Sequence, residues 1–153
     1  MQRREFFKTL GTAAVVATAL PSMSFASKVK HHNALSYEEA LKSITGGKGA
    51  KASSKVSLKV PEIAENGAVV PVSVKVDSPM SQNDYVKAIH IFATQNNNSR
   101  CVAVHLTPAN GVAMFSGRIK LGKTQDVATI VEMSNGEFLT ASQSVKVTIG
   151  GCG

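Results

Sequence analysis

The sequence predicts an all-β protein: an immunoglobulin-like antiparallel β-sandwich of about seven strands, with a short N-terminal helix and a flexible C-terminal tail. From residue 55 onward, apolar and polar side chains alternate with the period of two that a half-buried strand requires. Val, Thr, Ser and Ala are plentiful and Trp is absent. Turn residues divide the last part of the chain into short runs. A small barrel fits the same pattern.

Residues 1–26 have the layout of an export signal. Arg3 and Arg4 precede an apolar run that ends at a small-residue cleavage site, Ala26. The run is too short to span a membrane. The arginine pair is typical of the twin-arginine route, which carries folded proteins. We therefore expect a periplasmic protein.

Residues 27–54 are expected to form a polar leader, one short helix and a linker. The leader contains His31 and His32. Ser36 followed by Glu39 has the spacing of a capping box, and "GG" at 46–47 is a helix-ending signal. The segment "GGKGAKASS" indicates a flexible linker.

Residues 55–149 form the predicted sandwich. Pro71 has no N–H to donate to a neighbouring strand, so it indicates an edge position or a bulge. The letters "ENG" at 65–67 indicate a turn. We expect strands at residues 56–60, 70–76, 86–95, 100–107, 112–121, 127–133 and 139–149.

One hairpin has a predicted register. The four-residue loop "NNNS" puts Gln95 opposite Arg100, which pairs the core residues Ile91 with Val104. On the same count Ile89 pairs with Leu106. A shift by one residue would turn the apolar side chains away from the core.

The opposite face of this hairpin would carry His90, Phe92 and His105, with Cys101 opposite Thr94. Either the helix or a loop covers this face, or it is a partner surface, since an exposed apolar and aromatic patch usually marks one. A metal site made of the two histidines is the weakest interpretation, because no third ligand is apparent.

Composition and motifs argue against an enzyme. The net charge is +7, but the lysines are spread singly along the chain, so we expect no nucleic-acid partner. No metalloprotease, nucleophile-elbow, redox or phosphate-loop motif occurs after the signal. We expect no catalytic residue, no metal and no cofactor, and the sandwich is interpreted as a scaffold.

The chemistry-bearing residue is Cys152, which lies between Gly151 and Gly153 and follows Gly150. Residues 150–153 are expected to form a slim, mobile tail. No helix N-terminus, cation or metal is supplied locally to lower the thiol pKa, so we expect a group that bears a substrate for other proteins. Cys101, within a strand, is expected to be a small packed residue.

These features together resemble one known family. A twin-arginine leader, "VPEIAENGAVVPVSV" at 60–74, a β-sandwich and a terminal "VTIGGCG" are similar to SoxY, the sulfur-carrier family of periplasmic thiosulfate oxidation. The resemblance implies a non-catalytic carrier of sulfur intermediates attached to Cys152, with Gly150, Gly151 and Gly153 as its swinging arm. The family tail is commonly GGCGG, whereas this sequence stops at Gly153.

The resemblance also implies partners. A SoxZ-like subunit would form a heterodimer with the chain. The haem protein SoxAX would couple thiosulfate to the thiol, SoxB would hydrolyse off sulfate, and in some organisms SoxCD would oxidise the remaining sulfur.

Two alternatives stay open. One is a periplasmic metal-binding or metal-delivery module that uses His31 and His32, with or without His90 and His105. The other is a redox protein in which Cys101 and Cys152 cycle as a dithiol.

Overall fold

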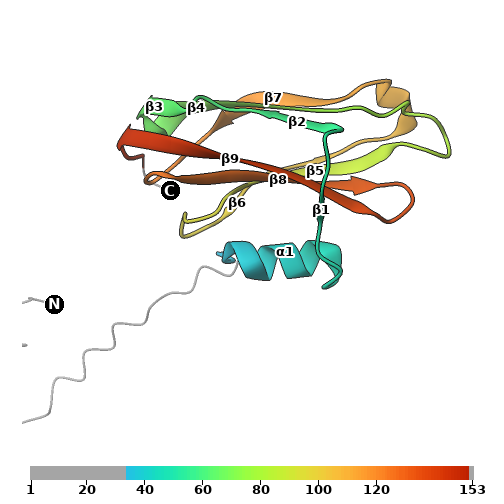
Figure 1. Ribbon diagram of the computed structural model, residues 1–153, viewed down its shortest axis with the longest axis horizontal. Helices are drawn as coiled ribbons and strands as arrows, with labels where there is room; N and C mark the ends of the chain where they lie inside the picture. The colour runs from blue at the N-terminus through green and yellow to red at the C-terminus, as the bar shows by residue number, and fades with distance from the viewer. Residues whose placement is uncertain (1–33, 152–153) are drawn as a thin grey trace, which may run out of the picture.

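The computed structural model describes residues 34–151 as two packed β-sheets with helix α1 beside one of them (Figure 1). This confirms the predicted β-sandwich. The elements are α1 Tyr37–Thr45, β1 Lys51–Ala52, β2 Val56–Lys59, β3 Ile63–Asn66, the 3-10 turn η1 Gly67–Val69, β4 Val70–Val76, β5 Val86–Ala93, β6 Arg100–His105, the 3-10 turn η2 Pro108–Asn110, β7 Ala113–Ile119, β8 Gln125–Met133 and β9 Phe138–Ile149.

The two sheets differ in size. The larger has the order β1-β9-β8-β5-β6, with β3 also paired to β9, and the smaller has the order β2-β4-β7. All seven predicted strands are present, and β1 and β3 bring the number in the described chain to nine. Both additional strands run parallel to β9, so the sandwich is not wholly antiparallel.

The predicted flexible linker is partly wrong. Lys51 and Ala52 pair with Leu139 and Thr140 of β9. The segment is exposed and has no apolar alternation, so its strand pairing leaves no signal in the sequence.

The helix has the predicted ends. The Ser36 hydroxyl accepts a hydrogen bond from the Glu39 amide, and the Ser36 amide donates to the Glu39 carboxylate at 3.0 Å. Gly46 ends the helix at φ 61°, a conformation that glycine adopts without strain. The capping box therefore fixes where the helix begins.

The main core lies between the sheets, and α1 adds a second layer outside the larger sheet. In β4 burial alternates along the strand, as expected for one covered face. In β5 every side chain from Ala88 to Ala93 is buried, because α1 covers the face that the other sheet does not.

The predicted hairpin register is wrong by two residues. Ile89 pairs with Val104 and Ile91 with Val102, and a bulge follows Ile91. A shift of two leaves the side chains of the regular pairs on their predicted faces, because strand side chains alternate with a period of two. The bulge breaks this alternation at Cys101, which was expected on the face of Phe92 and instead packs against the main core.

The end of β5 explains this shift. The amide of Thr94 donates to the Asp126 carbonyl at 3.1 Å, and the amide of Gln95 donates to the Gln125 side chain at 2.8 Å. These two residues are held by the start of β8 and are unavailable to β6, so the loop spans 94–99 instead of 96–99.

Pro71 lies in the central strand of the smaller sheet. It pairs with Arg118 of β7, but β2 stops pairing at Lys59 and Ser73. The proline is therefore at a local edge, beyond the end of β2, where its missing N–H breaks no strand pairing.

Among residues 34–151, no helix has the length and apolarity of a membrane span. The export signal with Arg3 and Arg4, the pair His31 and His32, and the tail residues Cys152 and Gly153 lie outside the described residues.

Candidate functional site

The chain reaches Gly151 at the end of the sandwich where β4 and β8 begin and β5 and β7 finish. There the Gly151 amide donates a hydrogen bond to the carbonyl of Leu121 at 3.0 Å. The Leu121 amide in turn donates to the carbonyl of Gly67 at 2.7 Å. Gly150 and Gly151 are therefore seated against the domain, a position that the sequence did not indicate.

The seat is built from backbone and has no room for side chains. A Cβ on Gly150 would lie 2.3 Å from the Gly122 oxygen, and one on Gly151 would lie 2.7 Å from the Ala68 nitrogen. A Cβ on Gly67 would lie 2.2 Å from the Leu121 oxygen. Glycine is thus required at these three positions because the backbone segments approach one another too closely for a Cβ atom, whether or not the tail is flexible.

The C-terminal end of β9 is also held by hydrogen bonds. The Thr148 hydroxyl donates to the Glu65 carbonyl at 2.9 Å, and the Val147 amide donates to the Thr124 hydroxyl at 2.9 Å. Register pairing of Ile149 with β3 completes the attachment. The tail therefore leaves from a well-anchored strand.

Asn96 organises the loop that forms one side of the seat. Its side-chain nitrogen donates to the Lys120 carbonyl at 2.8 Å. Its side-chain oxygen accepts from the Gly122 amide at 3.0 Å and from the Gln125 side chain at 2.8 Å. Sequence reasoning used "NNNS" only as a turn signal and missed this role.

Cys101 is partly buried and packed, as predicted, but it packs against the main core and not on the face of His90 and Phe92. Its sulfur lies 3.7 Å from the Ser99 carbonyl oxygen. Burial raises the pKa of the Cys101 thiol, so the residue carries little thiolate at neutral pH. The dithiol alternative also needs Cys152, which lies outside the described residues.

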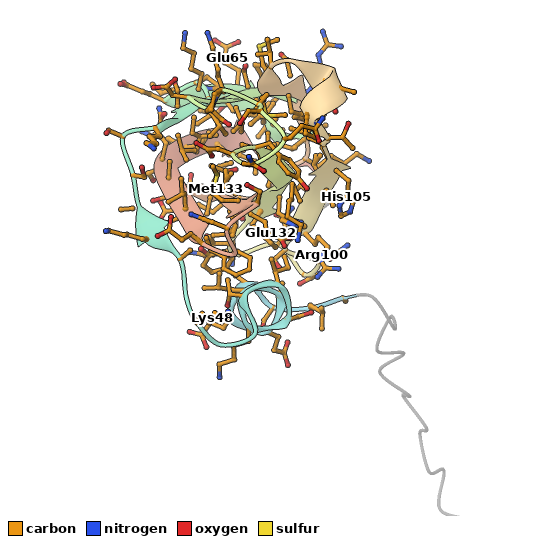
Figure 2. The ribbon with its side chains drawn as sticks, turned by 90° about the vertical axis from the view of Figure 1, so that its right-hand side faces the viewer. Lys48, Glu65, Arg100, His105, Glu132 and Met133 are labelled. Atoms are coloured by element: carbon orange, nitrogen blue, oxygen red, sulfur yellow. The ribbon has the colours of Figure 1, made fainter. Side chains whose placement is uncertain are left out.

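The face that carries His90, Phe92 and His105 is divided by α1. Phe92 is fully buried beneath the helix, with its ring edge-to-face against Tyr37 at 5.5 Å. His105 is exposed at the β6 edge, where Figure 2 shows it on the same side as Arg100. Of the two accounts of this face, the covering helix applies at Phe92, so that ring is not part of an open partner surface.

His90 is almost enclosed, with 7% of its surface exposed and its Nδ1 buried without a hydrogen-bond partner. Burial lowers the pKa of His90, and the charges of His105 and Arg100 act in the same direction. The rings of His90 and His105 are 6.2 Å apart. Within residues 34–151 no group of three potential metal-binding side chains occurs, so the structure adds no third ligand to this pair.

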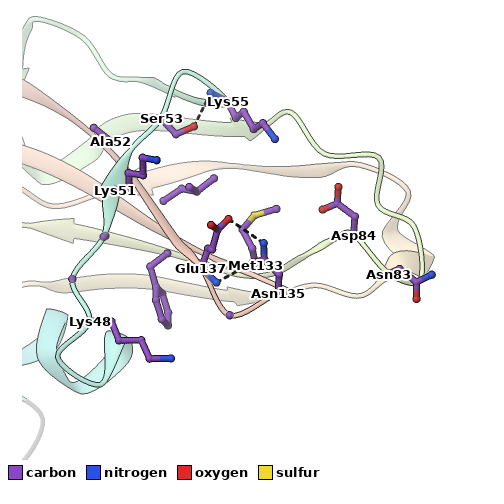
Figure 3. A pocket seen from close by; sticks show the side chains of 15 residues that line it. Lys48, Lys51, Ala52, Ser53, Lys55, Asn83, Asp84, Met133, Asn135 and Glu137 are labelled. Carbon is purple, nitrogen blue, oxygen red and sulfur yellow. Dashed lines mark hydrogen bonds between the residues drawn. The ribbon is translucent and has the colours of Figure 1, made fainter.

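A large open groove of about 700 Å³ lies at the other end of the sandwich (Figure 3). It is bordered by Lys48, Lys51 and Lys55 and by the turn that joins β8 to β9. The Glu137 carboxylate there accepts a hydrogen bond from Asn135 at 3.0 Å. The twelve residues of β9 separate this groove from Gly151, roughly 40 Å at the usual rise per residue, so it is not part of the tail site.

A family model described as "Sulfur oxidation protein SoxY" matches residues 41–152 of the chain. The solved sulfur carrier protein SoxY from Chlorobium limicola f thiosulfatophilum is 30% identical, with TM-score 0.62, over 73% of this chain and 96% of that chain. No curated protein sequence matches significantly.

Other solved structures share the fold alone. A superoxide reductase (neelaredoxin) variant from Ignicoccus hospitalis is 17% identical, with TM-score 0.51, over 74% of this chain and 98% of that chain. A putative superoxide reductase from Thermotoga maritima is 14% identical, with TM-score 0.50, over 60% of this chain and 84% of that chain.

Proposed function

The chain belongs to the SoxY family of sulfur oxidation proteins, and we propose that it carries sulfur intermediates covalently on the thiol of Cys152. A sulfur-oxidation carrier role follows from the family match and from the likeness to the carrier of Chlorobium limicola f thiosulfatophilum. The attachment point and the transfer between enzymes are the proposed part.

One structural observation supports this attachment point. β9 is anchored at the end of the sandwich. Two residues without side chains, Gly150 and Gly151, follow it and directly precede Cys152. Cys101, the other thiol, is partly buried with a raised pKa and is poorly suited to exchange between partners.

The proposed chemistry is done by partners. A haem protein of the SoxAX kind removes two electrons as it joins thiosulfate to the thiolate: RS⁻ + S₂O₃²⁻ → RS–S–SO₃⁻ + 2e⁻. A SoxB-like hydrolase then releases sulfate: RS–S–SO₃⁻ + H₂O → RS–S⁻ + SO₄²⁻ + 2H⁺. The chain itself supplies the attachment atom and needs no cofactor for either step.

The carrier also requires partner subunits and export to the periplasm. A SoxZ-like subunit forms the heterodimer, and a SoxCD-like enzyme oxidises the sulfur left on Cys152. Export by the twin-arginine route through Arg3 and Arg4 brings the carrier to the periplasm.

The test is loading by the oxidising partner. The purified protein is incubated with thiosulfate and SoxAX, and its C-terminal peptide is weighed by mass spectrometry. An added S–SO₃ group on Cys152, lost in Cys152→Ser and kept in Cys101→Ser, supports the proposal. An equal adduct in Cys152→Ser overturns it.

A further inference from the structure

A groove of about 300 Å³ lies between the beginning of β6 and the end of β7. Three cationic side chains border it: Arg100, Arg118 and Lys120. No acidic residue lines it, and the one ion pair in the described part of the chain joins Lys87 to Glu132 elsewhere. The groove therefore concentrates positive charge that no carboxylate of residues 34–151 neutralises at ion-pair distance.

This basic groove lies next to the tail seat. Lys120 borders the groove, and Leu121, the next residue, accepts the hydrogen bond from Gly151. Asn96 lines the groove and also holds the backbone of Lys120 and Gly122. Figure 1 shows the end of β9 and the beginning of β6 at the same end of the sandwich.

We propose that the basic groove binds the sulfonate end of the intermediate on Cys152 while Gly151 remains seated against Leu121. This inference rests on the proposed carrier function, and it assigns an anion-binding site to the carrier itself. The occupant is the loaded tail of the same chain.

The chemistry of the groove matches this ligand. A sulfonate spreads one negative charge over three oxygens, and the planar donors of Arg100 and Arg118 suit two oxygens of one oxyanion. Lys120, which precedes Leu121 in the chain, adds a third positive charge to the groove. Once sulfate has been released, the persulfide has no oxyanion, so the groove holds the sulfonate-bearing tail more firmly than the sulfonate-free tail.

The length of the loaded tail is sufficient. The carrier cysteine directly follows Gly151, so one peptide link of about 3.8 Å between Cα atoms joins them. The adduct then adds two S–S bonds of about 2.05 Å each before the sulfonate sulfur. Because the groove begins one residue from the seat at Leu121, the tail need not leave its seat to reach it.

The adduct can be installed chemically, without any partner enzyme. Tetrathionate loads the thiolate directly: RS⁻ + S₄O₆²⁻ → RS–S–SO₃⁻ + S₂O₃²⁻. Methyl methanethiosulfonate gives a neutral control: RS⁻ + CH₃SO₂SCH₃ → RS–SCH₃ + CH₃SO₂⁻. Mass spectrometry of the C-terminal peptide verifies the loading of Cys152 in each sample.

Backbone amide shifts of the loaded proteins test the proposal. We expect the charged adduct to shift the amides of Arg100, Arg118 and Lys120, and the neutral adduct to leave them near their unloaded positions. Shifts that are equal for the two adducts, or absent for both, overturn the inference. Failure of SoxAX to load Cys152 would instead count against the proposed function.

Loading rates give a second, independent readout. In a variant with Arg100→Gln, Arg118→Gln and Lys120→Gln, we expect loading by tetrathionate at low salt to slow by about tenfold or more, as for other steered anions. The neutral reagent should react at an unchanged rate. The matched variant with Lys42→Gln, Lys55→Gln and Lys75→Gln loses the same charge elsewhere and should keep the original rate; an equal loss there overturns the inference.

Discussion

The amide nitrogen of Gly151 lies 3.0 Å from the carbonyl oxygen of Leu121, and the Leu121 amide lies 2.7 Å from the carbonyl oxygen of Gly67. One residue thus links the start of the tail to η1. A single backbone hydrogen bond stabilises a conformation by only about 0.5–1.5 kcal/mol net. The tail is therefore held at a defined place and is still readily released to a partner.

Gly67→Ala tests the seat. Its Cβ would lie 2.2 Å from the Leu121 oxygen and 2.8 Å from the Gly151 nitrogen, so the backbone must move apart. We expect faster hydrogen exchange at the Gly151 amide and a loss of about 1–3 kcal/mol in unfolding free energy.

Gly49→Ala is the control for a general loss of stability. Gly49 has φ 72° with nothing within 4 Å of its Cβ position, so alanine there is strained but touches nothing. This variant should keep slow exchange at Gly151. Equal exchange at Gly151 in the two variants would show that the seat does not restrain the tail.

His90 gives the protein a sensitivity to acid. Its folded-state pKa is lowered, first by burial and then by His105 and Arg100, while Glu132 opposes the shift. The unfolded chain then binds a proton that the folded chain resists, so unfolding free energy falls as pH drops below about 6.5 and levels off below the folded pKa.

We expect His90→Leu to flatten this decrease between pH 7 and pH 5, as measured by urea unfolding at each pH. His105→Gln removes an exposed ring that is only one of the causes of the lowered His90 pKa. This variant should therefore keep most of the decrease in unfolding free energy. A wild-type slope that persists in His90→Leu would assign the acid sensitivity to other groups.

Cys101 should react slowly with alkylating reagents. Burial raises its pKa, and its side chain packs on the core, so both the thiolate fraction and access are reduced. Iodoacetamide at pH 8, followed by peptide mass spectrometry, should modify Cys101 much more slowly in the folded protein than in urea. Equal rates in the two conditions would contradict this description.

Comparing Phe92→Ala with His105→Ala tests whether α1 covers only part of the hairpin face. Phe92 is fully buried between Tyr37, Ala40 and Ile130, so truncation should lower unfolding free energy by about 3–5 kcal/mol. His105→Ala, at an exposed position, should change it by less than about 0.5 kcal/mol. Similar losses would mean that α1 does not protect Phe92.

Short-range patterns predicted most of the fold. The alternation of Val70, Val72, Val74 and Val76 identified β4 with both ends correct, and the Ser36 capping box identified the start of α1. Each depends on residues close in sequence, which is why the pattern alone sufficed.

Contacts between backbone segments far apart in the sequence could not be predicted from those patterns. The register of β5 depends on Asp126 and Gln125, about 30 residues away, and β1 adds to β9 through exposed residues with no alternation. The seat of Gly151 depends on Leu121 and Gly67, which are brought together only by the sheet topology. For the same reason the sequence predicted a carrier cysteine but not the surface beside it.

Two apolar side chains next to the tail seat give the last prediction. Val69, which follows the contact residue Ala68, is 55% exposed, and Ile149, two residues before Gly151, is 69% exposed. Exposed apolar residues beside a proposed attachment point are suited to contact a partner that receives the tail. We expect the variant with Val69→Ser and Ile149→Ser to slow SoxAX-driven loading by about tenfold, the effect of roughly 1.4 kcal/mol of lost contact.

The same variant should react with tetrathionate at the wild-type rate, because that reagent needs no protein surface. Val112 and Met114 are similarly exposed, at 55% and 53%, but Val112 directly precedes β7 and Met114 is its second residue, at the end of the sandwich away from the tail. Val112→Ser with Met114→Ser should therefore load normally with SoxAX. Equal slowing of SoxAX loading in both double variants would show that any loss of exposed apolar side chains has this effect. Slowing with tetrathionate would show that the substitutions alter the tail itself.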